Sequence, residues 1–547
     1  MSPAKERKHP KALPYLFFSE MWERFGYYLM IGIFTLYLKD VKSGFAMAEA
    51  EASDLYGTFI ALVFLTPFLG GLLADRYFGY RKSIIAGGLL MGVGYCMMSI
   101  HSIPSLYLSM TFVILGNGFF KPNISTLLGN VYSIPQYTMR KDEGYNIFYM
   151  GINIGAFICN FFGAVLYNTL GWSYAFIAAG IGMFIGVIIF IAGTKHYQHA
   201  DVKKGTRKGD MSFTRIVMLI LVPSVIAGII GRFIPGSIFG SDSTDAFIFA
   251  CIPVIYFYGN IYLKADKEEK RPIAALLAIF AVVILFWAVF KQNGSALNTW
   301  ADRYTDREVS GTTGKIFNAL QFSSSIGYVK DSVAKYDAAF RLQKVDGEII
   351  KEYNYHPYFK NLPTDQLPEE GGKIDLWATN LSQSINPFWV IVLTPLLLAF
   401  FAWLKKRNAE PTTATKIMYG LFISGISVLF MIAAVYASNN GTEKASVWWL
   451  ISSYGVVTIG ELFLSPMGLS MVSKLSPMRI TSLMMGGWFV STAIGNKLSG
   501  VLATMWDTYE NKANYFWVNF VLLMFATLLM LSMLKWLNKV MKEKGVH

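Results

Sequence analysis

Long apolar stretches are the feature of this 547-residue chain that most restricts its fold. Hydrophobic residues make up 54% of the sequence and charged residues 15%, whereas soluble proteins average about 25% charged residues. Because a membrane-spanning helix needs about 20 apolar residues, we count about fourteen candidate spans. They are 14–38, 51–74, 82–100, 104–128, 145–168, 172–193, 213–232, 245–263, 272–292, 385–404, 415–438, 446–471, 480–506 and 514–536. The sequence therefore predicts an all-α polytopic membrane protein embedded in a lipid bilayer.

The basic residues are distributed unevenly between the loops. Clusters precede the first span and follow every second span, whereas the alternate loops are poorer in basic residues or balanced by acids. Examples are Lys5 and Arg7, Arg81 and Lys82, Arg140 and Lys141, Lys203 and Lys204, Lys267 and Lys270, and Lys405 and Lys406. This positive-inside pattern predicts cytoplasmic termini and a place in the plasma (inner) membrane. It also accounts for the net charge of +13 without a nucleic-acid partner.

The sequence has no evident enzyme signature. The six histidines lie mostly in loops or near the termini, without metal-ligand spacing inside a span. No Gly-x-Ser-x-Gly elbow is present, and the three cysteines lie within apolar spans, as is typical of small buried residues. The N-terminus lacks a short apolar region followed by a small-residue cleavage site. We therefore expect no enzyme, no metal, no cofactor and no removable signal peptide.

The candidate spans group as six, two and six. We expect an N-terminal six-helix bundle at 1–200, a linker with two extra helices at 201–270, and a C-terminal six-helix bundle at 271–547. A polar, non-cytoplasmic insertion at 301–375 interrupts the last bundle, and it is equally consistent with a small folded unit and with a loosely ordered loop. Within it, Asp346-Gly347 between alternating residues indicates a hairpin. Two six-helix bundles are the architecture of the major facilitator fold, with a substrate site between the halves.

The end of the second span also indicates that fold. The stretch from Gly70-Gly71 through Asp75-Arg76 to Arg81-Lys82 resembles the cytoplasmic loop motif of major facilitators. Its glycines permit close helix approach, and Asp75 can accept hydrogen bonds from a neighbouring helix N-terminus or a basic residue as the halves move. We therefore expect Asp75 to take part in gating. The alternative is a solvated basic turn.

Three ionisable residues, Glu20, Glu23 and Arg24, lie within the first apolar span. Each costs roughly 2.5–3.5 kcal/mol at the centre of a bilayer, and such residues usually mark substrate or ion pathways. At about 100° per residue they share one helical face with Tyr27 and Tyr28, so we expect them to face a bundle interior or a water-filled cavity.

Two further charges lie alone in apolar surroundings: Lys121 in the fourth span and Glu461 in the twelfth. Each needs a partner on another helix, a ligand or water. One interpretation is that the two form a single ion pair that holds the bundles together. The other interpretation is that both residues bind a ligand that carries a positive and a negative charge. The two interpretations are compatible.

The first span resembles the Glu-x-x-Glu-Arg-Phe-x-Tyr-Tyr signature of the proton-dependent oligopeptide transporter family, and the resemblance extends over nearly all the chain outside 301–375. The further matching stretches are Gly118–Asn123, Phe148–Gly155, Phe286–Trp287, Gln292–Ser295, Asn386–Pro387, Gly460–Pro466 and Gly487–Phe489. The resemblance implies a proton-coupled symporter that imports di- and tripeptides by alternating access. It also implies that Lys121 and Glu461 take part in peptide binding and gating.

A short peptide is a zwitterion, which explains why the site needs charges of both signs. Its carboxylate suits Arg24 or Lys121, and its ammonium group suits Glu461 on the opposite half. Protonation of Glu20 or Glu23 would free Arg24 to bind the carboxylate, which would couple protons to transport; the alternative is that both acids only neutralise Arg24. The remaining expected substrate-binding residues are Tyr27, Tyr28, Tyr149, Asn153, Trp287, Asn386, Ser465 and Trp488. For any one of these aromatic residues, core packing or a membrane-interface position is as consistent with the sequence as ligand contact.

The chain departs from the family pattern at three positions. Ile31 replaces a common basic residue and Lys291 replaces a common acid, so the usual ion pair across the outer gate cannot form at these positions. Phe64 stands where a binding-site tyrosine is common. The closest alternative function is transport of nitrate or another small anion by a member of the same family. The retained cluster of Glu20, Glu23 and Arg24, together with Glu461, favours a zwitterionic peptide.

Overall fold

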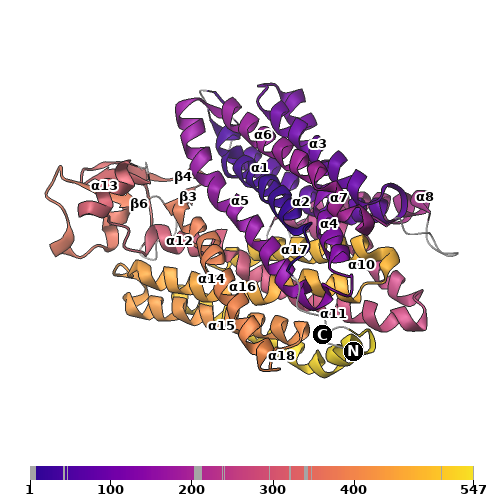
Figure 1. Cartoon of the computed structure of the whole chain (residues 1–547). Coiled ribbons are helices and arrows are strands. Elements are labelled where there is room, and N and C mark those ends of the chain that lie inside the picture. The colour runs from indigo at the N-terminus through magenta and orange to yellow at the C-terminus, as the bar shows by residue number, and fades with distance from the viewer. Residues whose placement is uncertain are drawn as a thin grey trace.

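The chain folds into a bundle of long helices with a small strand-containing unit at one end (Figure 1). A computed structural model describes the chain except residues 1–7, 41–42, 46, 48, 203–211, 237, 240, 295, 320–321, 338–342, 346–347, 378, 507 and 546–547. The first six long helices are α1 (Leu13–Lys39), α2 (Glu49–Leu73), α3 (Tyr80–Met98), α4 (Ile103–Val131), α5 (Lys141–Thr169) and α6 (Trp172–Ala192). They are followed by α9 (Val222–Arg232), α10 (Asp242–Leu263), α11 (Lys267–Phe290), α14 (Ser382–Lys406), α15 (Thr413–Ala437), α16 (Val447–Leu475), α17 (Thr481–Thr504) and α18 (Lys512–Glu543).

Every predicted span coincides with helical structure. The stretch 213–232 is formed by the short helix α8 (Phe213–Ile216), a π-helical turn and α9. Nine helices in the described part of the chain are long and apolar enough to cross a membrane by length and composition. The helix α1 is outside this group and carries three charged residues in its middle. The predicted polytopic α-helical class is confirmed, while the count of about fourteen spans stays a prediction.

Two sets of helices pack side by side. In the first set, α1 packs against α5 and α6, and α4 packs against α2 and α3. In the second set, α15 packs against α16 and α18, and α11 packs against α17 and α18. The sets meet where α2 lies along α17 and where α5 contacts α14 and α16. The pair α9 and α10 packs together, and α10 also contacts α17 and α2. The predicted division at 200 and 270 is compatible with this packing and stays a prediction.

The predicted insertion contains short antiparallel strand pairs. These are β1 (Ser323–Gly327) with β6 (Lys373–Trp377), β2 (Asp331–Ala334) with β5 (Lys351–Asn354), and β3 (Lys344–Val345) with β4 (Glu348–Ile349). The pairing of β3 with β4 agrees with the hairpin indicated at Asp346-Gly347, although these two residues themselves lie outside the described part. Tyr358, Phe359, Leu362 and Leu376 form a small core. Of the two alternatives that the sequence allowed for this insertion, a small folded unit and a loosely ordered loop, the structure shows the folded unit.

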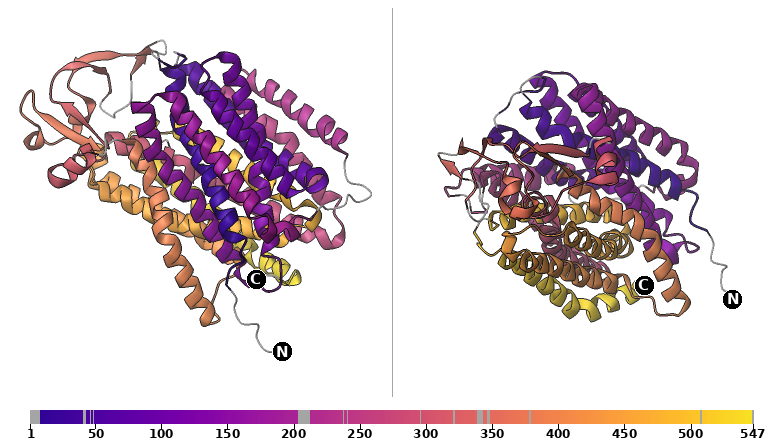
Figure 2. Two further views of the ribbon diagram at one scale, coloured as in Figure 1. Left: turned by 45° about the horizontal axis from the view of Figure 1, so that its top comes forward. Right: turned by 90° about the vertical axis from the view of Figure 1, so that its left-hand side faces the viewer.

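The insertion is joined to the helices through the loop between α15 and α16. Lys444 in that loop donates a hydrogen bond to the carbonyl oxygen of Arg303, at 3.0 Å. Its ammonium nitrogen also lies 3.9 Å from the centroid of the Tyr358 ring. Burial lowers the pKa of Lys444 to about 7. In Figure 2, left, the insertion lies at the opposite end of the helices from the two chain termini.

The end of the helices that carries the chain termini is called the terminal end below. His9, just before α1, lies 3.6 Å from the carboxylate of Glu143 near the start of α5. Lys405 at the end of α14 approaches the same carboxylate at 4.0 Å. Arg140 and Lys405 of the predicted positive-inside pattern lie at this end beside Glu143, and the orientation that the pattern predicts stays a prediction. Lys5, Arg7, Lys203 and Lys204 of that pattern lie outside the described residues.

The close approach of α2 and α4 depends on glycine. A Cβ atom added to Gly70 would overlap the backbone carbonyl oxygen of Gly118, so the two helices touch backbone to backbone. Thr66 reinforces the contact by donating a hydrogen bond to the carbonyl oxygen of Ile114, at 2.9 Å. Small residues at such crossings let helices pack closely in lipid, where the hydrophobic effect does not drive association.

We predict different effects on stability for two glycine-to-alanine substitutions. Gly70→Ala should destabilise the protein by about 1–3 kcal/mol, because α2 and α4 would have to separate. Gly32→Ala in α1 is the matched control, since nothing lies within 4 Å of its added Cβ, and it should be neutral or stabilising. Thermal unfolding and the monodisperse fraction of purified protein measure both effects. Equal behaviour of the two variants would contradict the packing argument.

Candidate functional site

The three charged residues of α1 are buried, as the sequence predicted. Glu20 and Arg24 are 2% exposed and Glu23 is 0% exposed. The guanidinium of Arg24 donates two hydrogen bonds to Glu23, through Nε and one terminal nitrogen. The Nε atom of Arg24 also lies 3.6 Å from Oε1 of Glu20. The three side chains therefore form one compact group in which Glu23 is the primary partner of Arg24.

The group is not fully satisfied within the described protein. Oε2 of Glu20 is buried and has no hydrogen-bond partner among the described residues. The guanidinium of Arg24 lies 4.8 Å from the ring centroid of Tyr27 and 6.0 Å from that of Tyr28, and these two rings meet edge to face. An unpaired buried oxygen is uncommon in native proteins and calls for a proton, a water molecule or a ligand.

Lys121 of α4 lies between two aromatic rings. Its ammonium nitrogen is 4.7 Å from the ring centroid of Phe64 in α2 and 4.7 Å from that of Phe489 in α17. Among the described residues it makes no hydrogen bond or ion pair within 4 Å. Contact with two ring faces compensates part of the cost of burying an ammonium group. Because Phe64 and Phe489 belong to different helix sets, this cation lies at the boundary between them.

Glu461 of α16 is buried and hydrogen-bonded on both oxygens. The hydroxyl of Tyr149 in α5 donates to Oε1, and Nδ2 of Asn386 in α14 donates to Oε2 at 2.8 Å. The same Asn386 nitrogen also contacts Thr458, at 2.9 Å. No Lys121–Glu461 ion pair appears among the described contacts. The described residues therefore do not form the ion pair that was one interpretation of the sequence. The hydrogen bond between Tyr149 of α5 and Glu461 of α16 joins the two helix sets instead.

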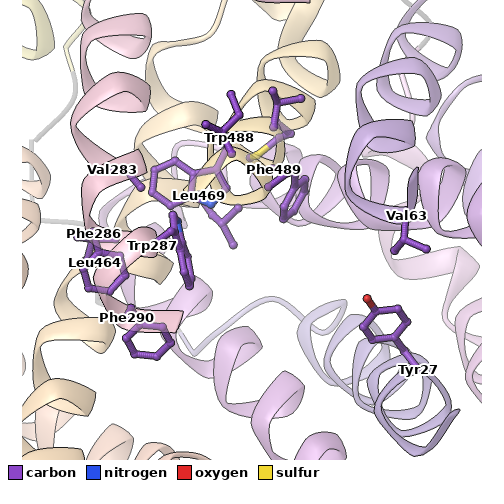
Figure 3. Close-up of a cluster of buried hydrophobic side chains, with 14 of the residues drawn as sticks. Tyr27, Val63, Val283, Phe286, Trp287, Phe290, Leu464, Leu469, Trp488 and Phe489 are labelled. Carbon is purple, nitrogen blue, oxygen red and sulfur yellow. The ribbon is translucent and has the colours of Figure 1, made fainter. Parts of the chain in front are cut away.

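Lys291 begins a 3-10 turn after α11, and the sequence did not identify its partner. Its ammonium nitrogen lies 5.7 Å from the ring centroid of Trp287 and 5.9 Å from that of Phe290. Glu461 is the carboxylate that attracts it electrostatically. Figure 3 shows Trp287 and Phe290 on the same helix, with Tyr27 on a separate helix across from them.

The other predicted binding residues differ in their surroundings. Asn153 lies one turn after Tyr149 on α5 and donates to its carbonyl oxygen at 3.0 Å. Trp287 is 6% exposed, and its indole nitrogen has no hydrogen-bond partner among the described residues. Trp488 packs inside the second helix set, where its ring fills the space beside Gly468 and meets Phe280 edge to face. Ser465 is buried one turn after Glu461. Substrate contact by these residues stays a prediction.

Asp75 accepts a hydrogen bond from the N-terminus of a neighbouring helix, which is one of the two contacts expected from the sequence. It lies in a π-helical turn (Ala74–Phe78) that follows α2. Its Oδ2 accepts a hydrogen bond from the backbone nitrogen of Leu483 in the first turn of α17, at 2.9 Å, and its Oδ1 accepts one from the hydroxyl of Tyr80, at 2.8 Å. A carboxylate at a helix N-terminus interacts favourably with the free N–H groups and the helix dipole. This contact joins the two helix sets at the terminal end.

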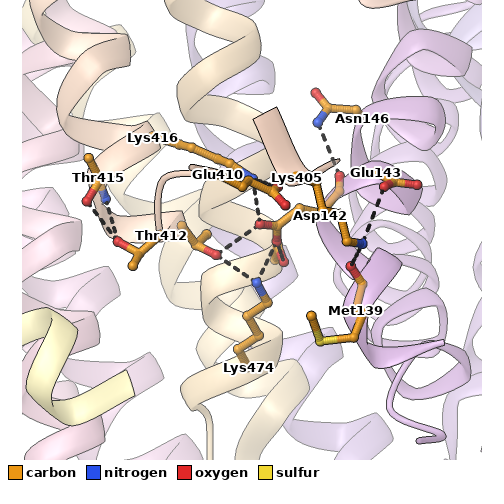
Figure 4. Close-up of polar contacts among 12 residues, drawn as sticks. Met139, Asp142, Glu143, Asn146, Lys405, Glu410, Thr412, Thr415, Lys416 and Lys474 are labelled. Atoms are coloured by element: carbon orange, nitrogen blue, oxygen red, sulfur yellow. Dashed lines mark hydrogen bonds and ion pairs between the residues drawn. The ribbon is translucent and has the colours of Figure 1, made fainter. Parts of the chain in front are cut away.

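A second charged cluster at the terminal end was missed by the sequence analysis (Figure 4). Asp142 in the first turn of α5 accepts from Lys474 of α16 at 2.7 Å and from Lys416 of α15 at 3.2 Å. The hydroxyls of Ser470 and Thr413 also donate to it. Lys416 is 1% exposed and pairs with Glu410 at 2.7 Å as well. The available signal was Lys416 itself, a single lysine near the start of a predicted apolar span.

The comparisons with known proteins agree with this geometry. A family model described as the POT family matches residues 81–321 and 375–518. The unmatched stretch between them, 322–374, holds β1 to β5 of the insertion. Similar proteins include the uncharacterized transporter YclF of Bacillus subtilis, 29% identical over 91% of this chain and 88% of that protein. Dipeptide and tripeptide permease A of Escherichia coli is 27% identical over 92% of this chain and 86% of that protein.

Solved structures of transporters share the fold. A crystal structure of peptide transporter POT with sulfate is 27% identical, with a TM-score of 0.63, and the match covers 98% of this chain and 97% of that chain. A mutant of peptide transporter POT with alafosfalin is 26% identical, with a TM-score of 0.62 and the same coverage. The family resemblance and the major facilitator fold expected from the sequence motifs are thus confirmed. This chain is a multi-pass membrane protein that belongs to the POT family.

Proposed function

We propose that this protein is a proton-coupled symporter that imports di- and tripeptides by alternating access. Its place would be the plasma (inner) membrane, with both termini in the cytoplasm. The observation that carries the proposal is the arrangement of buried charge between the two helix sets. Arg24 and Lys121 belong to the first set and Glu461 to the second. The peptide transporters among the similar proteins support this substrate class.

A peptide zwitterion matches this arrangement of charges. Its carboxylate would bind Lys121, which has no anionic partner within 4 Å among the described residues, and Arg24 once Glu23 releases it. Its ammonium group would bind Glu461 in place of the hydroxyl of Tyr149. The peptide would then connect the helix sets, with Asn153 and Asn386 available for its backbone amides. Binding between the two sets is the arrangement that alternating access requires.

Proton coupling would act through the group on α1. Deprotonated Glu23 pairs with Arg24 and so withholds the guanidinium from a ligand. Protonation removes that charge and frees Arg24 for the peptide carboxylate, and deprotonation after transport favours release. Glu20 is the second candidate, because Oε2 is buried without a partner in the described protein and can accept a proton there.

Gating would depend on contacts that join the helix sets. At the terminal end these are Asp75 with the start of α17 and Asp142 with Lys416 and Lys474. Near the middle they are Tyr149 with Glu461 and Lys121 with Phe489. Opening of the terminal end would require the Asp75 and Asp142 contacts to break, since each links a residue of the first set to residues of the second.

Uptake of a labelled dipeptide by purified protein in liposomes tests the function. We expect uptake to rise when the outside is acidified and to be competed by unlabelled di- and tripeptides. A dipeptide acetylated at its N-terminus should compete at least about tenfold less well, because it lacks the cation that Glu461 would bind. Competition by nitrate with no competition by peptides would replace this proposal with the small-anion alternative.

The proton-coupling role predicts that Glu23→Gln uncouples transport. Glutamine keeps hydrogen-bonding atoms near Arg24 but cannot take up a proton. Uptake driven by an acid gradient should fall about tenfold or more, while counterflow exchange at equal pH on both sides persists. Glu20→Gln is the matched comparison, because Glu20 lies farther from Arg24, at 3.6 Å. Undiminished gradient-driven uptake by Glu23→Gln would remove this role from Glu23.

The terminal-end contacts predict that Asp142→Asn favours opening at that end. The change removes the negative charge that Lys416 and Lys474 share. A cysteine at position 482, introduced as Ser482→Cys, serves as the reporter, because Ser482 is 0% exposed and donates a hydrogen bond to Thr126. Maleimide labelling of this cysteine should be about tenfold faster in Asp142→Asn than in the parent.

The control for this experiment is Glu543→Gln in the same reporter background, with the native cysteines replaced by serine. Glu543 pairs with Arg271 inside the second helix set and makes no described contact with the first set. It should leave labelling unchanged. Equal labelling rates in Asp142→Asn and the parent would show that the cluster does not hold this end closed.

A further inference from the structure

A basic recess at the terminal end lies outside the site described above. It has a volume of about 790 Å³ and lies between the last turn of α10, the first turns of α11 and the end of α18. In Figure 1, α11 and α18 lie near the C-terminus. The residues that define it are Tyr262, Lys267, Lys270, Arg271, Trp536 and Lys544.

The recess carries excess positive charge. Four basic and two acidic residues line it. Arg271 is neutralised by Glu543, whose two oxygens lie 2.9 and 3.2 Å from one guanidinium nitrogen. The ammonium groups of Lys267 and Lys544 make no hydrogen bond or ion pair with any described residue, and that of Lys270 lies 5.1 Å from the centroid of the Tyr262 ring. With Glu268 as the remaining acid, three lysines are available to an anion.

The other walls of the recess are apolar and aromatic. Pro272, Ala274 and Val540 line it together with Tyr262 and Trp536. Leu263, next to Tyr262, is 69% exposed. Aromatic residues of this kind concentrate at the level of lipid headgroups, and basic pockets between helix ends bind anionic headgroups. A soluble anion would use the lysines but would leave the apolar walls in contact with water.

We propose that this recess binds the phosphate-bearing headgroup of an anionic phospholipid, with Lys267, Lys270 and Lys544 around the phosphate. The acyl chains would run along the exposed apolar surface beside Leu263. The lipid would thereby connect α10, which packs on α17 and α2, with α11 and α18 of the second helix set. This proposal does not depend on the transported substrate.

Lipid titration of the full-length, delipidated protein in detergent tests the proposal. The probes are phosphatidylglycerol, zwitterionic phosphatidylcholine and inorganic phosphate, with bound lipid counted by native mass spectrometry and stability followed by thermal unfolding. Phosphatidylglycerol should bind at least about tenfold more tightly than the other two. The double variant Lys267→Gln/Lys270→Gln should lose about fivefold in affinity per lysine.

The matched control is Lys535→Gln/Lys539→Gln, which removes two exposed lysines of α18 that do not line the recess. It should keep the affinity of the parent. If the recess double variant does not fold, Lys544→Gln alone should still lose about fivefold. Equal losses in recess and control variants, or equal binding of both lipids, would overturn the proposal. Inorganic phosphate binding as tightly as phosphatidylglycerol would make the recess a phosphate site and would overturn the lipid assignment.

Discussion

The pairing of Arg24 with Glu23 in the middle of α1 is the interaction on which the proposed site depends. A guanidinium in a bilayer is too costly to leave alone, so an acid must accompany it during folding. Yet a guanidinium that remains fully paired cannot bind an anionic ligand. The arrangement resolves this conflict because a second acid, Glu20, lies 3.6 Å away with one unpaired oxygen. A proton can therefore change the local charge balance without leaving a bare cation in a low-dielectric environment.

The contacts between the two helix sets are of two kinds. Some are polar, such as Tyr149 on Glu461 or Asp75 on the start of α17. Others are close backbone contacts, because a Cβ atom added to Gly71 of α2 would overlap the backbone carbonyl oxygen of Ser482 in α17. Polar contacts of this kind can be exchanged for ligand or water at modest net cost, whereas the glycine-mediated packing of α2 on α4 cannot. The boundary between the sets thus combines polar contacts, which ligand or water can replace, with close packing of α2 on α17.

The departures from the family pattern change the electrostatics around Glu461. Lys291 is a cation where relatives commonly have an acid, and it is attracted to Glu461 while lying near Trp287 and Phe290. Lys121, which one interpretation of the sequence paired with Glu461, lies between Phe64 and Phe489. Phe64 thus has a local role, because its ring stabilises the partly buried ammonium of Lys121 where a tyrosine is common in the family.

The sequence alone determined the membrane class, the positions of the helices, the buried charged stripe on α1 and the family. The first three follow from local composition and periodicity, because lipid requires long apolar helices and makes each buried charge conspicuous, whereas the family follows from the resemblance of the sequence motifs. Only the tertiary structure decided which charges meet. The sequence could not distinguish a Lys121–Glu461 pair from the observed separation, and it did not reveal that Asp142 meets Lys416 and Lys474. Such partners lie hundreds of residues apart in sequence, and helix rotation and crossing angles, which depend on many packing contacts at once, bring them together.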